Sequence, residues 1–134
     1  MNRKHKVIVI EDDKDINRLI VYNLEKEGFE AISVYDGLEA RKRLQSDSFE
    51  VVVLDIMLPG IDGFDICKDI KEDPEAYKTF VIMLTAKSSA QDKIHAHLLG
   101  ADGYITKPFH VSSLVSTVRE LSSVRDKDFT VTLD

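Results

Sequence analysis

Short apolar runs alternate with amphipathic helical patterns along the chain, and this rhythm limits the folds it can adopt. Five runs predict strands, at residues 6–11, 30–35, 51–55, 80–86 and 101–106. Helical patterns follow each of them, at about 14–27, 37–46, 63–73, 91–99 and 111–121. The third run, VVVLD, is continuously apolar, which indicates a strand covered on both faces. Five strands alternating with five helices predict an α/β fold, a doubly wound parallel sheet with helices on both sides.

The apolar positions of each helical pattern fall on one face, which we expect to point into the core. The predicted inward positions are Ile16, Leu19, Ile20, Leu24, Leu38, Leu44, Phe64, Cys67, Ile70, Val111, Leu114, Val115, Val118 and Leu121.

Composition narrows the function classes. A length of 134 residues suits one domain, and a net charge of −6 argues against a nucleic-acid surface. The N-terminal MNRKHK leads into only four apolar residues, and no apolar run nears the ~20 residues of a membrane helix, so we expect no signal peptide and no membrane partner. Cys67 is the only cysteine and cannot form an internal disulfide, which favours a cytoplasmic location. We interpret it as a buried, unreactive thiol.

Polar residues that could take part in a reaction lie where the predicted strands end. The first strand ends at Glu11 and Asp12, the third at Asp55 and the fourth at Thr85, while the fifth leads to Lys107. In open parallel sheets, ligands bind outside the carboxyl ends of the strands. These side chains, far apart in sequence, are therefore predicted to meet at one edge of the sheet.

This set of groups suits phosphoryl transfer. Clustered carboxylates repel one another unless a cation lies among them, and hard oxygen ligands favour Mg²⁺. A carboxylate beside such an ion can act as a nucleophile toward phosphorus. A lysine and a hydroxyl then help to neutralise the charge of the transferred group.

Four segments in order, IVIEDD, VVVLDIMLPGIDG, VIMLTA and GADGYITKPF, resemble the signature segments of the bacterial response-regulator receiver domain, the CheY-like family. The spacing also matches, with 30 residues from Asp55 to Thr85 and 22 from Thr85 to Lys107. The resemblance covers about residues 5–122 and implies a flavodoxin-like sheet with strand order 2-1-3-4-5. It divides the chain into a receiver domain at 1–122 and a tail at 123–134.

The resemblance also implies roles for individual residues. Asp55 matches the phosphoacceptor, and Thr85 and Lys107 match the catalytic hydroxyl and amine beside it. The implied Mg²⁺ ligands are Glu11, Asp12, Asp55 and the backbone carbonyl of Met57. Thr85 and Tyr104 match the switch pair of the family, and Met57 and Lys87 match the positions that tune phosphate lifetime. The Lys107–Pro108 bond matches a peptide bond that is cis in the family. Asp13 is expected to cap the first helix, as acids at this position commonly do.

What the family implies for function is a signalling switch that catalyses only its own phosphorylation and dephosphorylation. A sensor histidine kinase or a histidine phosphotransfer protein would phosphorylate Asp55. The face built from the fourth helix, fifth strand and fifth helix would then change and engage an output partner or a second copy. Direct nucleic-acid binding by this chain is not expected.

Three other functions compete with this interpretation. A haloacid-dehalogenase-type phosphatase needs a second aspartate two positions after its nucleophile, where this chain has Met57. A nucleotide- or flavin-binding protein would carry a glycine- or hydroxyl-rich loop after the first strand, where this chain has EDDKD. A degenerate receiver used only for docking would need none of the acidic, hydroxyl and lysine groups. The tail, VRDKDFTVTLD, alternates Phe129, Val131 and Leu133 and is a linker, the start of an output domain, or a strand that pairs with a partner.

Overall fold

A five-stranded parallel sheet forms the centre of the computed structural model, which describes residues 5–131, with side chains up to Val124. Its strands are β1 (Lys6–Ile10), β2 (Glu30–Val34), β3 (Val51–Leu54), β6 (Phe80–Thr85) and β7 (Gly103–Thr106). They lie in the order β2-β1-β3-β6-β7, and all neighbours pair in parallel. This confirms the predicted order, in which the second strand lies at one edge and the fifth at the other.

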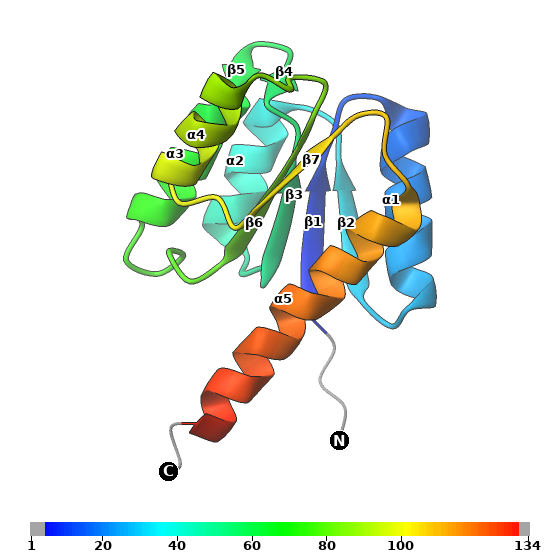
Figure 1. Ribbon diagram of the computed structural model, residues 1–134, viewed down its shortest axis with the longest axis vertical. Helices are drawn as coiled ribbons and strands as arrows, with labels where there is room; N and C mark the ends of the chain where they lie inside the picture. The colour runs from blue at the N-terminus through cyan, green and yellow to red at the C-terminus, as the bar shows by residue number, and fades with distance from the viewer. Residues whose placement is uncertain (1–4, 132–134) are drawn as a thin grey trace.

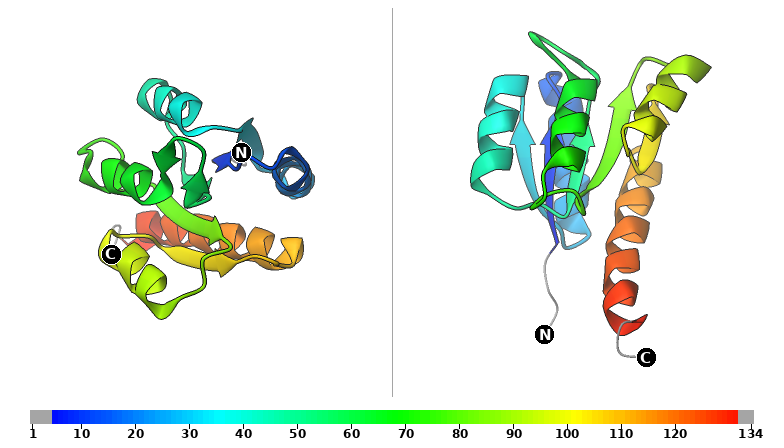
Figure 2. Two further views of the ribbon diagram at one scale, coloured as in Figure 1. Left: turned by 90° about the horizontal axis from the view of Figure 1, so that it is seen from above. Right: turned by 90° about the vertical axis from the view of Figure 1, so that its left-hand side faces the viewer.

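Within residues 5–131, five helices cover the sheet, and Figures 1 and 2 show that they lie on both of its faces. They are α1 (Lys14–Lys26), α2 (Gly37–Ser46), α3 (Gly63–Glu72), α4 (Ala90–Leu98) and α5 (Val111–Val131). Helices α1 and α5 pack on one face, and α2, α3 and α4 on the other.

The alternation of side chains along each strand builds two separate cores. Val7 and Val9 of β1 point to the face of α1 and α5, while Ile8 and Ile10 point to the face of α2, α3 and α4. All four are fully buried. On β3, Val51 and Val53 belong to the core under α1 and α5, and Val52 and Leu54 to the other core, so the continuous apolar run VVVLD is covered on both faces, as predicted.

A short hairpin that the sequence did not predict follows β3. Strands β4 (Met57–Leu58) and β5 (Ile61–Asp62) pair in antiparallel fashion around Pro59 and Gly60. Gly60 has a φ of +78°, a conformation that favours glycine. Strands of two residues are too short to show a periodic pattern.

Two predicted inward positions are wrong. Leu19 is 50% exposed on α1, and Leu38 is 67% exposed on α2. On α2 the buried residues are Gly37 and Ala40. A Cβ at Gly37 would lie 2.7 Å from the Cβ of Ile61, so the start of α2 approaches β5 too closely for a larger residue to face inward.

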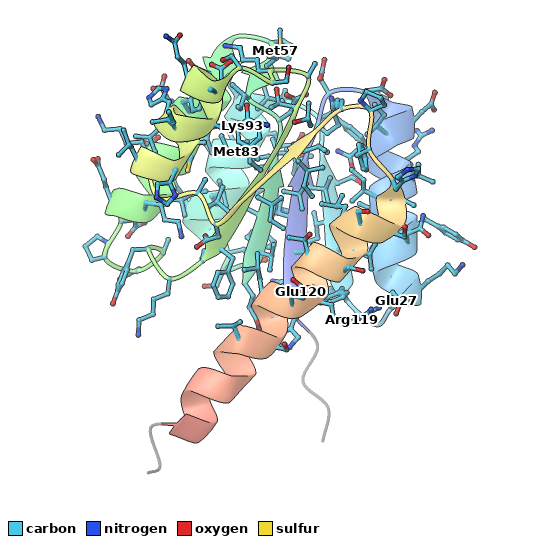
Figure 3. All side chains as sticks on the ribbon, viewed as in Figure 1. Glu27, Met57, Met83, Lys93, Arg119 and Glu120 are labelled. Carbon is cyan, nitrogen blue, oxygen red and sulfur yellow. The ribbon has the colours of Figure 1, made fainter. Side chains whose placement is uncertain are left out.

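Helix α5 extends past the sheet at its lower end in Figure 1 and continues to Val131 without a break at residue 122. The described part of the tail is thus helical rather than extended, and Leu133 lies outside the described residues. Arg119 of α5 forms an ion pair with Glu27, the C-cap of α1, and the two side chains lie together in Figure 3. Within residues 5–131, no helix combines the length and apolar composition that a bilayer span requires.

Candidate functional site

Two acids, Glu11 and Asp12, follow β1 at the carboxyl end of the sheet. The backbone N–H of Glu11 donates to the carbonyl of Val34 over 3.1 Å, which extends the sheet ladder by one bond beyond the strand. The side chain of Glu11 is buried, and that of Asp12 is exposed. Asp13 accepts hydrogen bonds from the N–H groups of Asp15 and Ile16, so the predicted helix cap is confirmed.

The end of β3 holds Asp55 by its backbone and its side chain. Its N–H donates to the carbonyl of Ile10 over 3.0 Å, and its Oδ1 accepts from the N–H of Met57 over 2.9 Å. A Cβ at Gly63 would lie 2.5 Å from both the carbonyl oxygen of Asp55 and the Cα of Ile56. Only glycine lets the start of α3 pack this closely behind the acid.

Glu11, Asp12 and Asp55 come together as predicted. Each offers a carboxylate oxygen, and the three oxygens lie within 4.8 Å of one another. Three convergent carboxylates, two of them buried, are the donor set that a hard divalent cation prefers. The residues present therefore fit a magnesium site, in which water would complete the ligand shell.

Lys107 reaches into the same cluster from the loop after β7. Its Nζ lies 2.9 Å from Asp55 Oδ2 and forms a second ion pair with Glu11 Oε1. The backbone N–H of Lys107 donates to the carbonyl of Thr85 over 2.8 Å, and the Lys107–Pro108 peptide bond is cis, as predicted. The lysine is thus held beside both buried acids.

Burial and the neighbouring charges shift two pKa values at this site. Burial raises the pKa of Glu11 to about 7, although the Lys107 ammonium and the Asp13 N–H oppose the rise. Burial lowers the pKa of Lys107, but the hydrogen bonds and charges of Glu11 and Asp55 outweigh that effect and leave it above its usual value. Lys107 therefore stays charged at neutral pH, whereas Glu11 is close to its titration point.

Thr85 and Tyr104 are linked through a single residue of the loop after β6. Thr85 is fully buried, and its Oγ1 accepts from the N–H of Lys87 over 3.2 Å. The Tyr104 hydroxyl donates to the carbonyl of the same Lys87 over 2.7 Å. The two residues predicted as a switch pair therefore share the backbone of Lys87.

Met57 and Lys87 were predicted to tune the lifetime of the phosphorylated state. Met57 is 55% exposed on β4 and lies at the upper edge of the molecule in Figure 3. The Lys87 ammonium lies 5.8 Å from the ring centroid of Phe64, which also stacks on the ring of His95. The roles proposed for these two side chains stay predictions.

Sequence reasoning missed Asn17, a fully buried amide on α1. Its Nδ2 donates to the carbonyls of Val9, Glu11 and Val34. Position 17 lies three residues before Ile20 and seven before Leu24, on the buried stripe of the helix. A polar residue on an apolar stripe was the signal that could have found it.

Comparisons with known proteins agree with this geometry. The family model of the response regulator receiver domain matches residues 7–119. The receiver domain of Francisella response regulator 1452 is 33% identical, with a TM-score of 0.84, and the match covers 91% of this chain and 99% of that one. The chemotaxis response regulator CheY4 of Vibrio cholerae is 28% identical, with a TM-score of 0.83 and coverages of 89% and 99%. Response regulator DrrB of Thermotoga maritima, described as an OmpR/PhoB homologue, is 31% identical with a TM-score of 0.82. That match covers 92% of this chain but 54% of the longer protein.

Proposed function

This chain belongs to the response regulator receiver domain family of two-component signalling, and we propose that Asp55 is its phosphoacceptor. The observation that carries the proposal is the contact of Asp55 with Lys107, next to two further acids at the carboxyl end of the sheet. The phosphoryl donor would be a histidine of a sensor kinase or of a phosphotransfer protein. In the transfer, a carboxylate oxygen of Asp55 bonds to phosphorus while the phosphorus–nitrogen bond of the donor breaks and its electron pair stays on the imidazole.

Each neighbour of Asp55 has a part in this proposal. Glu11, Asp12, Asp55 and the carbonyl of Met57 would hold Mg²⁺, which when bound offsets the charge on the transferred phosphoryl oxygens. Lys107 keeps its charge at neutral pH, so its ammonium can pair with the phosphoryl oxygens once Asp55 carries the group.

Thr85 would sense the phosphoryl group. Its hydroxyl accepts from Lys87 and can still donate its own proton to a phosphoryl oxygen. If Thr85 moves toward the phosphoryl group, it pulls on Lys87 and, through Lys87, on the hydroxyl of Tyr104.

The proposed output face is built from α4, β7 and α5. Ile94 and Leu98 stand one helical turn apart on α4 and are 59% and 76% exposed. Exposed apolar side chains next to the Tyr104 strand suit a surface that engages a partner or a second copy after phosphorylation. We also propose that residues 1–122 form the receiver and that 123–134 connect it to whatever follows.

Two competing functions predict different behaviour. A phosphatase with an aspartate nucleophile would need a general acid at position 57, and a methionine cannot transfer a proton. A docking module without phosphorylation would not need the ion pair between the buried Glu11 and the half-buried Lys107.

The test is the intact mass after incubation with acetyl phosphate, with and without Mg²⁺, beside the variant Asp55→Asn. A receiver gains one phosphoryl group only with Mg²⁺, and the variant gains none. If acetyl phosphate fails, a histidine kinase or phosphotransfer protein replaces it as donor. A wild-type chain that stays unmodified with every donor, and does not respond to beryllofluoride, would be a docking module.

A further inference from the structure

We infer that Asn17 is a positioning residue of the acidic cluster, whose side-chain amide fixes the backbone of Glu11 and thereby sets the affinity of the site for Mg²⁺. The inference rests on the proposed function, because it assumes that Glu11 takes part in holding the cation.

The contacts of Asn17 converge on the point where β1 ends. Its Nδ2 lies 3.1 Å from the carbonyl oxygen of Val9, 3.0 Å from that of Glu11 and 3.0 Å from that of Val34. The nitrogen has two hydrogens, so the three carbonyls share them. Three surrounding acceptors also decide the orientation of the amide, since a flipped side chain would present its oxygen to them.

Glu11 depends on this contact because the sheet stops pairing there. The last register pair between β1 and β2 is Ile10 with Val34. Beyond it, the N–H of Glu11 still donates to Val34, while its carbonyl accepts from Asn17 instead of from a strand. Hydrogen bonds therefore hold the backbone of Glu11 at both its N–H and its carbonyl, and Asn17 supplies the bond to the carbonyl.

The carboxylate of Glu11 has little freedom of its own. It is fully buried, its Oε2 accepts from the N–H of Asp13 over 3.0 Å, and its Oε1 pairs with Lys107. A rotation of the Glu11 peptide would therefore be transmitted to the oxygens that lie beside Asp55. Partners that orient a metal ligand commonly change metal affinity by roughly 10- to 100-fold when they are removed.

A purely structural role is the competing explanation. Asn17 also lies one turn after the cap of α1, where its N–H donates to the carbonyl of Asp13 over 2.9 Å, so its loss could simply loosen the helix. Leu24 gives a matched control, since it is fully buried on the same helix but lies about two turns further along it than Asn17. Leu24→Ala should destabilise the fold through a cavity and leave the site alone.

The experiment is an NMR titration of wild type, Asn17→Ala and Leu24→Ala with Mg²⁺, below the unfolding temperature of each. The amide of Asp13 gives a second readout in the metal-free protein, because it donates to the Glu11 carboxylate. We expect Asn17→Ala to weaken Mg²⁺ binding by about 10-fold and to shift and expose the Asp13 amide. Leu24→Ala should change neither, although it lowers the unfolding temperature.

The results separate the inference from the proposed function. A dissociation constant for Asn17→Ala within twofold of wild type, or an equal loss in Leu24→Ala, overturns the positioning role and leaves the phosphoacceptor intact. A wild-type chain that does not bind Mg²⁺ overturns the metal site itself, and the inference with it. If Asn17→Ala does not fold, Asn17→Ser keeps a single donor and is judged by the same twofold limit.

Discussion

The hydroxyl of Tyr104 donates a 2.7 Å hydrogen bond to the backbone carbonyl of Lys87, whose own N–H donates to the hydroxyl of Thr85. A residue of β7 is thus tied to the loop after β6 through the residue that also contacts Thr85. Burial raises the pKa of Tyr104, so this hydroxyl keeps its proton and remains a donor at neutral pH.

Tyr104→Phe keeps the ring but removes this bond. We expect about 1 kcal/mol lower stability and unchanged phosphorylation of Asp55, because the hydroxyl of Tyr104 bonds to the carbonyl of Lys87 rather than to an acid. The response of residues 86–98 to beryllofluoride and Mg²⁺, followed by hydrogen exchange, should be much smaller than in wild type. Tyr77→Phe, at an exposed tyrosine, is the control. A wild-type exchange response in Tyr104→Phe would contradict the link.

Glu11→Gln should change how stability depends on pH. The pKa of Glu11 is about 7 in the folded chain and near 4.5 for an ordinary glutamate, so the folded state binds the extra proton between these values. The proton that folded Glu11 holds therefore stabilises the fold fully below about pH 4.5. This stabilisation, up to about 3 kcal/mol, is lost as the pH rises to 7. Urea unfolding of both proteins without metal, from pH 5 to 8, measures the difference. Parallel curves would show that the buried carboxyl does not titrate in this window.

Lys107→Met should separate metal binding from phosphorylation. The ammonium pairs with both Glu11 and Asp55, so its removal takes a competing cation out of the acidic cluster. We expect tighter Mg²⁺ binding, by a few-fold, and slower phosphorylation of Asp55 by at least about 10-fold, since a charge that stabilises the transferred group is lost. Calorimetric titration and intact mass give the two values, and Lys93→Met on the exposed side of α4 is the control. Weaker Mg²⁺ binding in Lys107→Met would show that the lysine organises the acids rather than competing with a cation.

Gly63→Ala tests the close approach behind Asp55. The added Cβ would come within 2.5 Å of backbone atoms of Asp55 and Ile56, which cannot move aside as a flexible side chain can. We expect a loss of about 1–3 kcal/mol in stability and a slower phosphorylation of Asp55. Gly103→Ala is the matched control, because its Cβ would meet its nearest neighbour at an ordinary 3.5 Å. Equal losses in the two variants would argue against a special role for Gly63.

Met57→Asn tests the lifetime of the phosphorylated state. Met57 follows Asp55 by two residues, its N–H donates to Asp55 Oδ1, and its exposed side chain offers no hydrogen bond that could position an attacking water. An asparagine would offer one, so we expect the phosphoryl group of the variant to decay several-fold faster. The loss of phosphoryl mass with time measures both rates, and a slower decay in Met57→Asn would reject the idea.

Local patterns were sufficient for most of the architecture. The continuous apolar run before Asp55 predicted a strand with two covers, and both cores lie where the alternation of Val7, Ile8, Val9 and Ile10 puts them. The convergence of Glu11, Asp12, Asp55 and Lys107 could be predicted because parallel strands end at a common edge.

Errors arose where a segment distant in sequence decides the packing. Leu38 looked like a core residue of its helix, but the inward positions of α2 are Gly37, which lies against Ile61, and Ala40, while Leu38 is exposed. The hairpin of β4 and β5 and the position of the Lys87 side chain over Phe64 likewise depend on neighbours that no local pattern reveals.

Periodicity and residue type are local properties of the chain, and they were enough to predict the order of strands and helices and the chemical groups at the strand ends. The tertiary structure decided how those groups are held: Asn17 spans Val9, Glu11 and Val34, and Lys87 joins Thr85 to Tyr104. These contacts form only when separate strands and loops are brought together. Their strength depends on burial and geometry, which the order of residues does not express.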